Sequence, residues 1–328
     1  MSVIGNTLIV AFMLGLLPLV GCKSTGGNKS EVNEKKTDVR SSERKEIIFD
    51  ADSAYAYVAR QVNFGPRVPN TEAHSQAGDW LASELRRHGA AVVEQRAVLT
   101  AFDGTPLQAR NIFGQYNPQS SDRLLLLAHW DCRPWADNDP DPSMRKMPVD
   151  GANDGASGVG VLLEIARQLA LNLPSRGVDI LFVDAEDWGE EGNDDSWALG
   201  TQYFVSHPPV EGYFPSEAIL LDMVGGNEAV FSREYFSERT APGLTNRLWQ
   251  GAARLGHGDM FVNQLGTAVL DDHVELIRAG IPAVDIIEYN PDGGGFNPRW
   301  HTISDNMDGI SAATLKAVGE TVLEYIFN

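Results

Sequence analysis

The stretch "LLLLAHWD" (Leu124–Asp131) is a continuous apolar run that ends in a histidine and an acid. Three further runs have the same form, namely "DILFVDAED" (Asp179–Asp187), "AILLDMVG" (Ala218–Gly225) and "AVDIIEY" (Ala283–Tyr289). Apolar runs of this length without alternation indicate strands buried on both faces. Helical spacing of apolar residues lies around them, at Thr71–His88, Ser157–Leu171, Pro242–Leu255, His273–Ala279 and Ser311–Phe327. We therefore predict an α/β fold with a central mixed, mostly parallel sheet flanked by helices on both faces.

The predicted strands carry polar side chains at their carboxyl ends. Ligands of open α/β sheets bind at that edge, so residues far apart in the sequence can meet there. The residues at these positions are His129, Asp131, Glu186, Asp187 and Asp222. The acidic, proline-rich segment Asp137–Val149 is predicted to be a loop over the same edge.

A second stretch, "VDGANDGASGVGVLLEIA" (Val149–Ala166), places Asp154 between glycines where an apolar helix begins. Glycine and other small residues leave space beside the carboxylate, and a helix N-terminus is a common ligand site. We expect Ser157 to be the N-cap of this helix. The alternative is that Asp154 only closes a local Asx-turn.

Together with the late His301, these positions form a set of carboxylates and imidazoles suited to zinc. Each of them alone has an ordinary explanation as a solvated or hydrogen-bonded side chain. Their recurrence at matching strand ends favours a site. Because neighbouring side chains of an extended backbone point apart, one member of the Glu186–Asp187 pair can bind a metal while the other acts as acid or base.

Composition limits the remaining possibilities. The chain has 328 residues, of which 43% are hydrophobic, and a net charge of −19, which is unsuited to nucleic acid. Its two cysteines exclude a disulfide framework, so His, Asp and Glu would have to hold any metal.

The first 45 residues differ from the rest. The apolar run Thr7–Cys22 is too short to span a bilayer, and its end, "LVGC", resembles the lipobox of bacterial lipoproteins. We predict a signal peptide over residues 1–22 with Cys22 lipidated, a disordered tether over 23–45, and one catalytic domain over 46–328. The resemblance implies a lipid-anchored protein of the bacterial cell envelope that faces the periplasm or the exterior.

The body of the chain resembles the zinc aminopeptidase and glutaminyl cyclase superfamily, from "FGPRVPNTEAH" (Phe64–His74) through the C-terminal helix. The shared motifs are "HWD", "GAND", the acid pair, a following strand-end Asp and "WHT", in this order. The resemblance implies that Asp154, Asp187 and His301 bind zinc and that Glu186 is the catalytic acid and base. Asp222 is then either a ligand of a second metal or a hydrogen-bonding catalytic partner.

Two tryptophans favour the cyclase branch. Trp300 directly before His301, with Trp197 as a second wall, resembles bacterial glutaminyl-peptide cyclotransferases. That branch implies one Zn²⁺ and conversion of the N-terminal Gln of peptides or proteins to pyroglutamate, with release of ammonia. Possible second-metal or supporting residues are His129, Asp131, Asp272 and Asp285.

Two alternatives stay open at this point. In a two-zinc aminopeptidase, Asp154 would bridge the metals, and His129 and Asp222 would complete the second site. A binding module that kept the fold and lost the chemistry is disfavoured, because Glu186 and the ligand positions are intact.

Overall fold

The computed structural model describes residues Glu46–Asn328. The predicted signal peptide with Cys22, and the predicted tether, lie outside these residues. Among the described helices, none combines the length and the apolar character needed to cross a bilayer.

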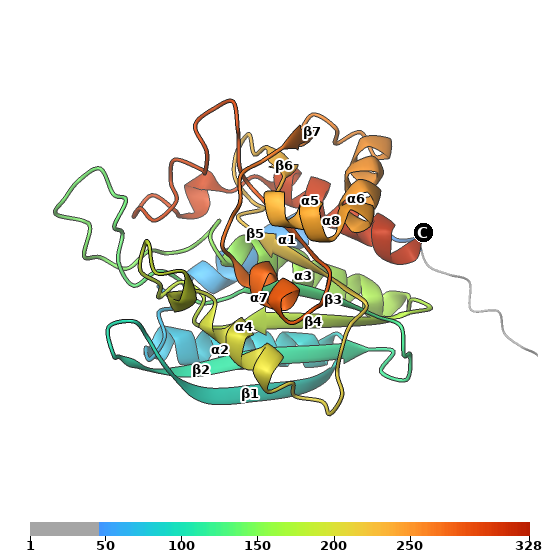
Figure 1. Cartoon of the computed structure of the whole chain (residues 1–328), viewed down its shortest axis with the longest axis horizontal. Coiled ribbons are helices and arrows are strands. Elements are labelled where there is room, and N and C mark those ends of the chain that lie inside the picture. Colours follow the sequence, from blue (N-terminus) through green and yellow to red (C-terminus); the bar gives the residue numbers. More distant parts are fainter. Residues whose placement is uncertain (1–45) are drawn as a thin grey trace, which may run out of the picture. The chain divides into compact units, whose positions relative to one another are not determined.

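Six strands of the described chain form one sheet in the order β1-β2-β4-β3-β5-β8 (Figure 1). Their bounds are β1 Ala91–Thr100, β2 Pro106–Tyr116, β3 Arg123–His129, β4 Gly177–Val183, β5 Glu217–Asp222 and β8 Ala283–Ile287. Strands β4, β3, β5 and β8 pair in parallel, whereas β2 pairs antiparallel with both β1 and β4. The predicted mixed, mostly parallel sheet is confirmed. A separate parallel pair consists of β6 Phe231–Arg233 and β7 Phe261–Leu265.

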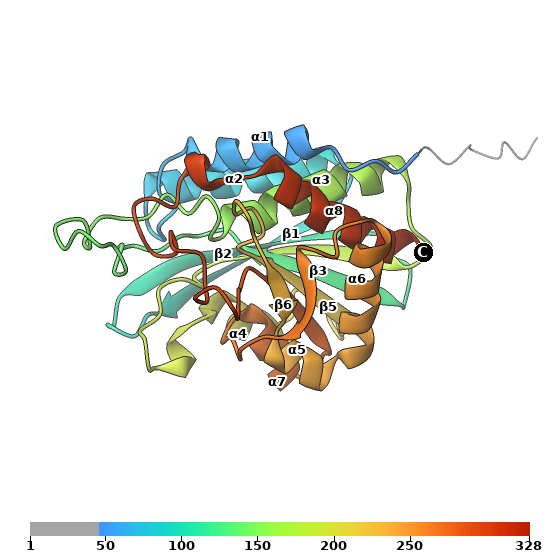
Figure 2. The ribbon, with the colours of Figure 1, turned by 90° about the horizontal axis from the view of Figure 1, so that it is seen from above.

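Helices cover both faces of the six-stranded sheet, as predicted. Figure 2 shows α1, α2, α3 and α8 on one side and α4, α5 and α7 on the other, with α6 beside α8. The α-helices are α1 Ala51–Val62, α2 Glu72–Arg87, α3 Ala156–Leu171, α4 Leu199–Ser206, α5 Tyr235–Thr240, α6 Pro242–Arg254, α7 Asp272–Arg278 and α8 Ala312–Phe327. Short 3₁₀ turns lie at Asp194–Ser196 and Met307–Gly309.

Strand β3 shows why the central runs are apolar throughout. Leu124, Leu126 and Ala128 belong to the apolar core beneath α1, α3 and α8, whereas Leu125 and Leu127 belong to the core on the opposite face. All five side chains are fully buried. A strand with helices on both sides has no solvent face to carry polar residues.

The start of α3 corrects one prediction. Gly155 is the N-cap, and Ser157 lies inside the helix, where its hydroxyl donates to Asn153 O at 2.5 Å and accepts from Val224 N at 2.9 Å. Ser157 therefore ties the helix to the turn after β5 instead of capping it. At Gly158 a Cβ would lie 2.0 Å from Leu221 O, so only glycine allows α3 to pack this closely on β5.

Candidate metal and substrate site

Three buried side chains converge beyond the carboxyl ends of the central strands. Asp154 precedes α3, Asp187 follows β4, and His301 lies in the loop between β8 and α8. One ligand atom from each lies within 4.8 Å of the others. His301 Nε2 is 3.2 Å from Asp187 Oδ1 and 3.6 Å from Asp154 Oδ2. The structure thus brings together the three residues predicted to bind zinc.

The bonding state of Asp187 indicates what this cluster can hold. Both of its carboxylate oxygens are buried, and no hydrogen bond from the described residues reaches either one. The nearest positive groups are His301 Nε2 at 3.2 Å and Arg133 Nη1 at 3.7 Å from Oδ1, and neither makes a hydrogen bond, so both oxygens keep lone pairs that a further cation could use. Two carboxylates and one imidazole form a donor set that zinc accepts, with a fourth position left for substrate. The residues present therefore fit a bound zinc ion.

A second cluster shares Asp154 with the first one. His129 Nε2 lies 3.0 Å from Asp154 Oδ1 and forms a 3.1 Å hydrogen bond with Asp222 Oδ1. One ligand atom from each of these residues also lies within 4.8 Å of the others. Here the imidazole already bridges the two carboxylates, so their negative charge has a partner within the protein.

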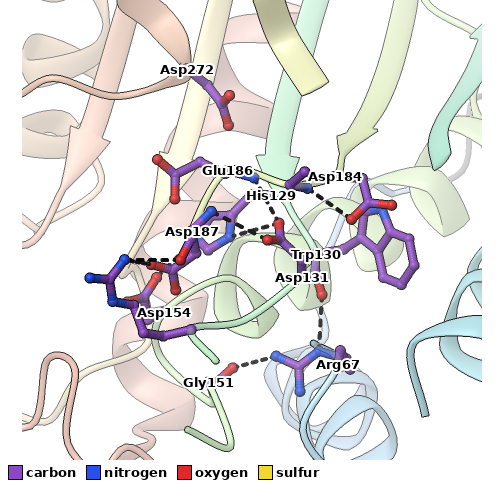
Figure 3. A network of polar contacts seen from close by, with 12 residues as sticks. Arg67, His129, Trp130, Asp131, Gly151, Asp154, Asp184, Glu186, Asp187 and Asp272 are labelled. Atoms are coloured by element: carbon purple, nitrogen blue, oxygen red, sulfur yellow. Dashed lines mark hydrogen bonds and ion pairs between the residues drawn. The ribbon is translucent and has the colours of Figure 1, made fainter. Parts of the chain in front are cut away.

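Asp131 lies behind the acid pair (Figure 3). Its two carboxylate oxygens accept the backbone N–H groups of Glu186 at 3.1 Å and of Asp187 at 3.3 Å. The carboxylate of Asp131 is therefore occupied by backbone donors, and it supports the site without joining either cluster of possible ligands.

Backbone strain is concentrated around the site. Ala185, Ala198, Met223 and His301 have φ values of 54°, 53°, 46° and 56°, in the left-handed region that non-glycine residues rarely adopt. Ala185, Ala198 and Met223 are the sequence neighbours of Glu186, Trp197 and Asp222, and His301 is itself a possible ligand. Such strain persists where the surrounding structure fixes it, and it is common at functional sites.

Glu186 is buried next to the cluster and faces a pocket. Burial raises its pKa well above the usual range, and the charges of Asp271 and Asp187 add to the effect while His129 opposes it. A carboxyl group with a raised pKa can hold a proton near neutral pH and exchange it, as a general acid and base must.

The pocket has a volume of about 250 Å³ and apolar walls. Trp197 and Trp300 line it, as predicted, together with Met223, Val269, Leu270, Ile287 and Phe296. The Trp300 ring stacks on His301 with centroids 4.0 Å apart, and the Trp197 ring lies nearly parallel to His301 at 6.2 Å. An apolar space large enough for one side chain therefore lies next to the three possible metal ligands and Glu186.

Two predicted supporting residues lie elsewhere. Asp272 does not line the pocket, because its Oδ1 accepts from the Thr201 hydroxyl at 2.6 Å, whereas its neighbour Asp271 caps α7 and lines the pocket. Asp285 is 3.7 Å from His273 Nδ1 and forms a separate group of buried ligand atoms with Asp271 and His273. Neither Asp272 nor Asp285 belongs to the cluster of Asp154, Asp187 and His301.

Sequence reasoning missed two residues that fix the Asp154 loop. Arg67 is fully buried and donates to Trp130 O, Asp150 O and Gly151 O at 2.7–3.0 Å. Asp305 accepts the backbone N–H groups of Asn153 at 2.8 Å and Asp154 at 3.1 Å. Arg67 lies in the "FGPRVPNTEAH" segment where the resemblance to the superfamily begins, but all its acceptors are backbone oxygens, which the sequence does not mark.

Comparisons with known proteins agree with this geometry. The model of peptidase family M28 matches residues 111–326. The solved glutaminyl cyclase of Bacteroides thetaiotaomicron, bound to N-acetylhistamine, is 51% identical, with a TM-score of 0.84 over 86% of this chain and 98% of that one. A Zn-dependent exopeptidase from Parabacteroides distasonis is 54% identical, with a TM-score of 0.84 over 86% of this chain and 99% of that one.

A curated relative is more distant. Aminopeptidase YwaD of Bacillus subtilis is 27% identical over 80% of this chain. The chain spans only 54% of the length of that aminopeptidase.

Proposed function

Because this chain belongs to peptidase family M28, we propose that it is a zinc-dependent glutaminyl-peptide cyclotransferase that converts N-terminal Gln of peptides or proteins to pyroglutamate. Similarity to a solved glutaminyl cyclase over nearly the whole of that enzyme supports the assignment. The zinc dependence is supported by the family and by the Zn-dependent exopeptidase relative.

The observation that carries the proposal is the contrast between the two clusters. Both carboxylate oxygens of Asp187 are buried without a hydrogen bond, which leaves the cluster of Asp154, Asp187 and His301 open to a cation. In the second cluster His129 lies 3.0 Å from Asp154 and is hydrogen-bonded to Asp222, so these carboxylates depend less on an added cation. This contrast supports one Zn²⁺ per chain, and a single metal would favour cyclisation over two-metal hydrolysis.

Asp154, Asp187 and His301 would hold the zinc ion, which would supply a Lewis acid for the carbonyl of the substrate's γ-carboxamide. The α-amine attacks the carbonyl carbon of the γ-carboxamide (Cδ) of the same Gln residue. One C–N bond forms, the bond to the carboxamide nitrogen breaks, and ammonia leaves without consumption of water.

The side chains of the pocket divide the remaining work. Glu186 takes the proton from the attacking nitrogen and returns one to the leaving nitrogen, for which its raised pKa suits it. Asp222 accepts a hydrogen bond from the attacking amine and holds it in place. Trp197 and Trp300 keep the Gln side chain folded, which brings the reacting atoms together and excludes water.

A two-zinc aminopeptidase is the second candidate. The close grouping of His129, Asp154 and Asp222 favours it, because this group would hold a second metal if the ion replaced the imidazole proton. It differs from the cyclase in two measurable ways, since it requires two metals per chain and releases free amino acids.

One incubation separates the two. Residues 46–328 are mixed with Gln-initiated and Leu-initiated dipeptides, with and without a zinc chelator, and the products are weighed by mass spectrometry. The cyclase loses one ammonia from the Gln peptide and leaves the Leu peptide intact, whereas the aminopeptidase releases free Leu.

We also propose that Cys22 is lipidated and that residues 23–45 tether the catalytic domain to the bacterial envelope. The sequence around Cys22 is the support for this proposal. Cys22→Ser should abolish incorporation of a labelled fatty acid and release the chain from the membrane fraction, while its peptide turnover is unchanged.

A further inference from the structure

Arg133 is a buried cation that belongs to none of the clusters described above. It retains only 3% of its surface exposed and lies just after β3, at the start of the acidic loop. Its Nη1 donates to Asp187 O at 3.0 Å and to Gly189 O at 2.9 Å. The guanidinium thus holds the backbone that presents Asp187.

The other edge of the guanidinium forms a bidentate ion pair with Asp137. Arg133 Nε and Nη2 lie 3.2 Å and 2.6 Å from the two carboxylate oxygens of Asp137. Asp137 Oδ1 in turn lies 3.3 Å from His301 Nδ1. A carboxylate at this nitrogen fixes the tautomer and the ring orientation, so that Nε2 is free to bind a metal.

The faces of the guanidinium contact aromatic rings. Its central carbon lies 4.8 Å from the ring centre of Trp197 and 4.9 Å from that of Trp135. An arginine cation is attracted to such ring faces, and the attraction is stronger where water is excluded. The same side chain therefore braces one wall of the pocket.

We propose that Arg133 is a positioning residue that holds two of the three zinc ligands and the Trp197 wall in one arrangement. It acts on Asp187 through the backbone and through a 3.7 Å contact between Nη1 and Asp187 Oδ1, and it acts on His301 through Asp137. The inference rests on the proposed function, because the zinc site and the pocket belong to it. Lysine cannot replace Arg133, since it lacks the planar fork that makes paired contacts.

Three variants test the proposal. R133K removes the fork and D137N removes the negative charge beside His301. R123K is the matched control, because Arg123 is also a buried arginine that pairs with one carboxylate, that of Asp179, but it lies at the opposite end of β3 from the site. Zinc affinity is measured by competition with a chromophoric chelator, and KM and kcat for a Gln dipeptide are measured at saturating zinc.

The proposal predicts that D137N and R133K both weaken zinc binding about 10- to 100-fold. R133K additionally raises KM several-fold, because Trp197 loses the planar guanidinium that lies against its ring, whereas D137N leaves KM unchanged. R123K lowers the melting temperature but binds zinc as the wild type does.

Wild-type zinc affinity in both R133K and D137N would overturn the proposal, and so would an equal loss in R123K. Failure of the proposed function has a different signature. The wild type would then bind zinc, with the affinity differences intact, and yet leave the Gln dipeptide unchanged.

Discussion

Asp131 Oδ1 accepts the backbone N–H of Glu186 at 3.1 Å, and Oδ2 accepts the next N–H along the chain at 3.3 Å. This contact fixes the turn after β4, in which Ala185 has a left-handed φ of 54°. The two adjacent acids therefore have different positions. Asp187 is one of the possible metal ligands, and Glu186 faces the pocket.

Asp131→Asn should impair the site, because the amide offers one acceptor and places an NH₂ group against a backbone N–H. We expect kcat/KM and zinc affinity to fall about 10- to 100-fold. Asp272→Asn is the control, since Asp272 is a buried acid that bonds to Thr201 and not to these amides. Equal losses in both variants would mean that Asp131 has no specific role.

Glu186→Gln should keep zinc and lose turnover. The amide preserves the size of the side chain but cannot accept and return a proton, so kcat should fall about 10²- to 10⁴-fold. Zinc content is checked by metal analysis of the same sample. Glu191→Gln, an exposed acid of the same pocket, should stay within a few-fold of the wild type. Unchanged turnover in the Glu186 variant would remove it from the mechanism.

Gly189→Ala should displace the Trp197 wall. A Cβ at Gly189 would lie 2.0 Å from a carbon of the Trp197 ring, so the ring must move. Because substrate position depends on that ring, kcat/KM should fall by about 10- to 100-fold, and most of the change should be in KM. Gly243→Ala on α6 meets no neighbour closer than 3.7 Å and should leave both constants unaltered.

Removal of zinc should destabilise the protein as well as inactivate it. Free zinc at 1,000 times its dissociation constant stabilises a folded protein by about 4 kcal/mol. Dialysis against a chelator should lower the melting temperature, and stoichiometric zinc should restore it. Restoration at one equivalent per chain supports the single-zinc site, whereas a second equivalent needed for activity would favour the aminopeptidase.

Glu234 should stabilise the protein above pH 4.5 and contribute to its loss of stability in acid. Burial raises its pKa, but the hydrogen bond with His273 at 3.1 Å and the amides of Phe236 and Ser237 outweigh this and lower the pKa from 4.5 to about 2. The stabilisation is complete above pH 4.5 and is lost as the pH falls through 2. Urea titrations of Glu234→Gln should show a shallower decline of the unfolding free energy across this window. A decline as steep as that of the wild type would refute this role.

Much of the central fold was predictable because burial on both faces leaves a simple pattern. The runs that became β3, β4, β5 and β8 are apolar throughout, and no solvent face interrupts them. Strands β1 and β2, which form the antiparallel side of the sheet, were not predicted. The residues of β1 are either exposed or half-buried and none is fully buried, so the strand has no continuous apolar run and its signal in the sequence is weak.

The site was predictable at the level of residues and not of contacts. His129, Asp154, Glu186, Asp187, Asp222 and His301 follow buried strands or lie in loops at one edge, so the topology brings them together. For two adjacent residues, the sequence does not tell which side chain faces the pocket. Asp271 and Asp272 are chemically alike, and only the start of α7 places the first at the pocket and the second against Thr201.

Arg133 and Arg67 escaped prediction for another reason. Both arginines donate to backbone oxygens of residues distant in the sequence. Every residue has such an oxygen, so the amino-acid sequence does not show which ones will be bound. The same holds for Ser157, whose place in the sequence suits an N-cap but whose hydroxyl bonds across to the turn after β5.

Product analysis with paired dipeptides tests the central claim most directly. Residues 46–328 with one equivalent of zinc are incubated with Gln-initiated and Leu-initiated dipeptides, and the products are identified by mass spectrometry. The account predicts that the Gln peptide alone changes, by loss of one ammonia, and that a chelator prevents it. Free Leu, with the Gln peptide uncyclised, would contradict the account and identify an aminopeptidase.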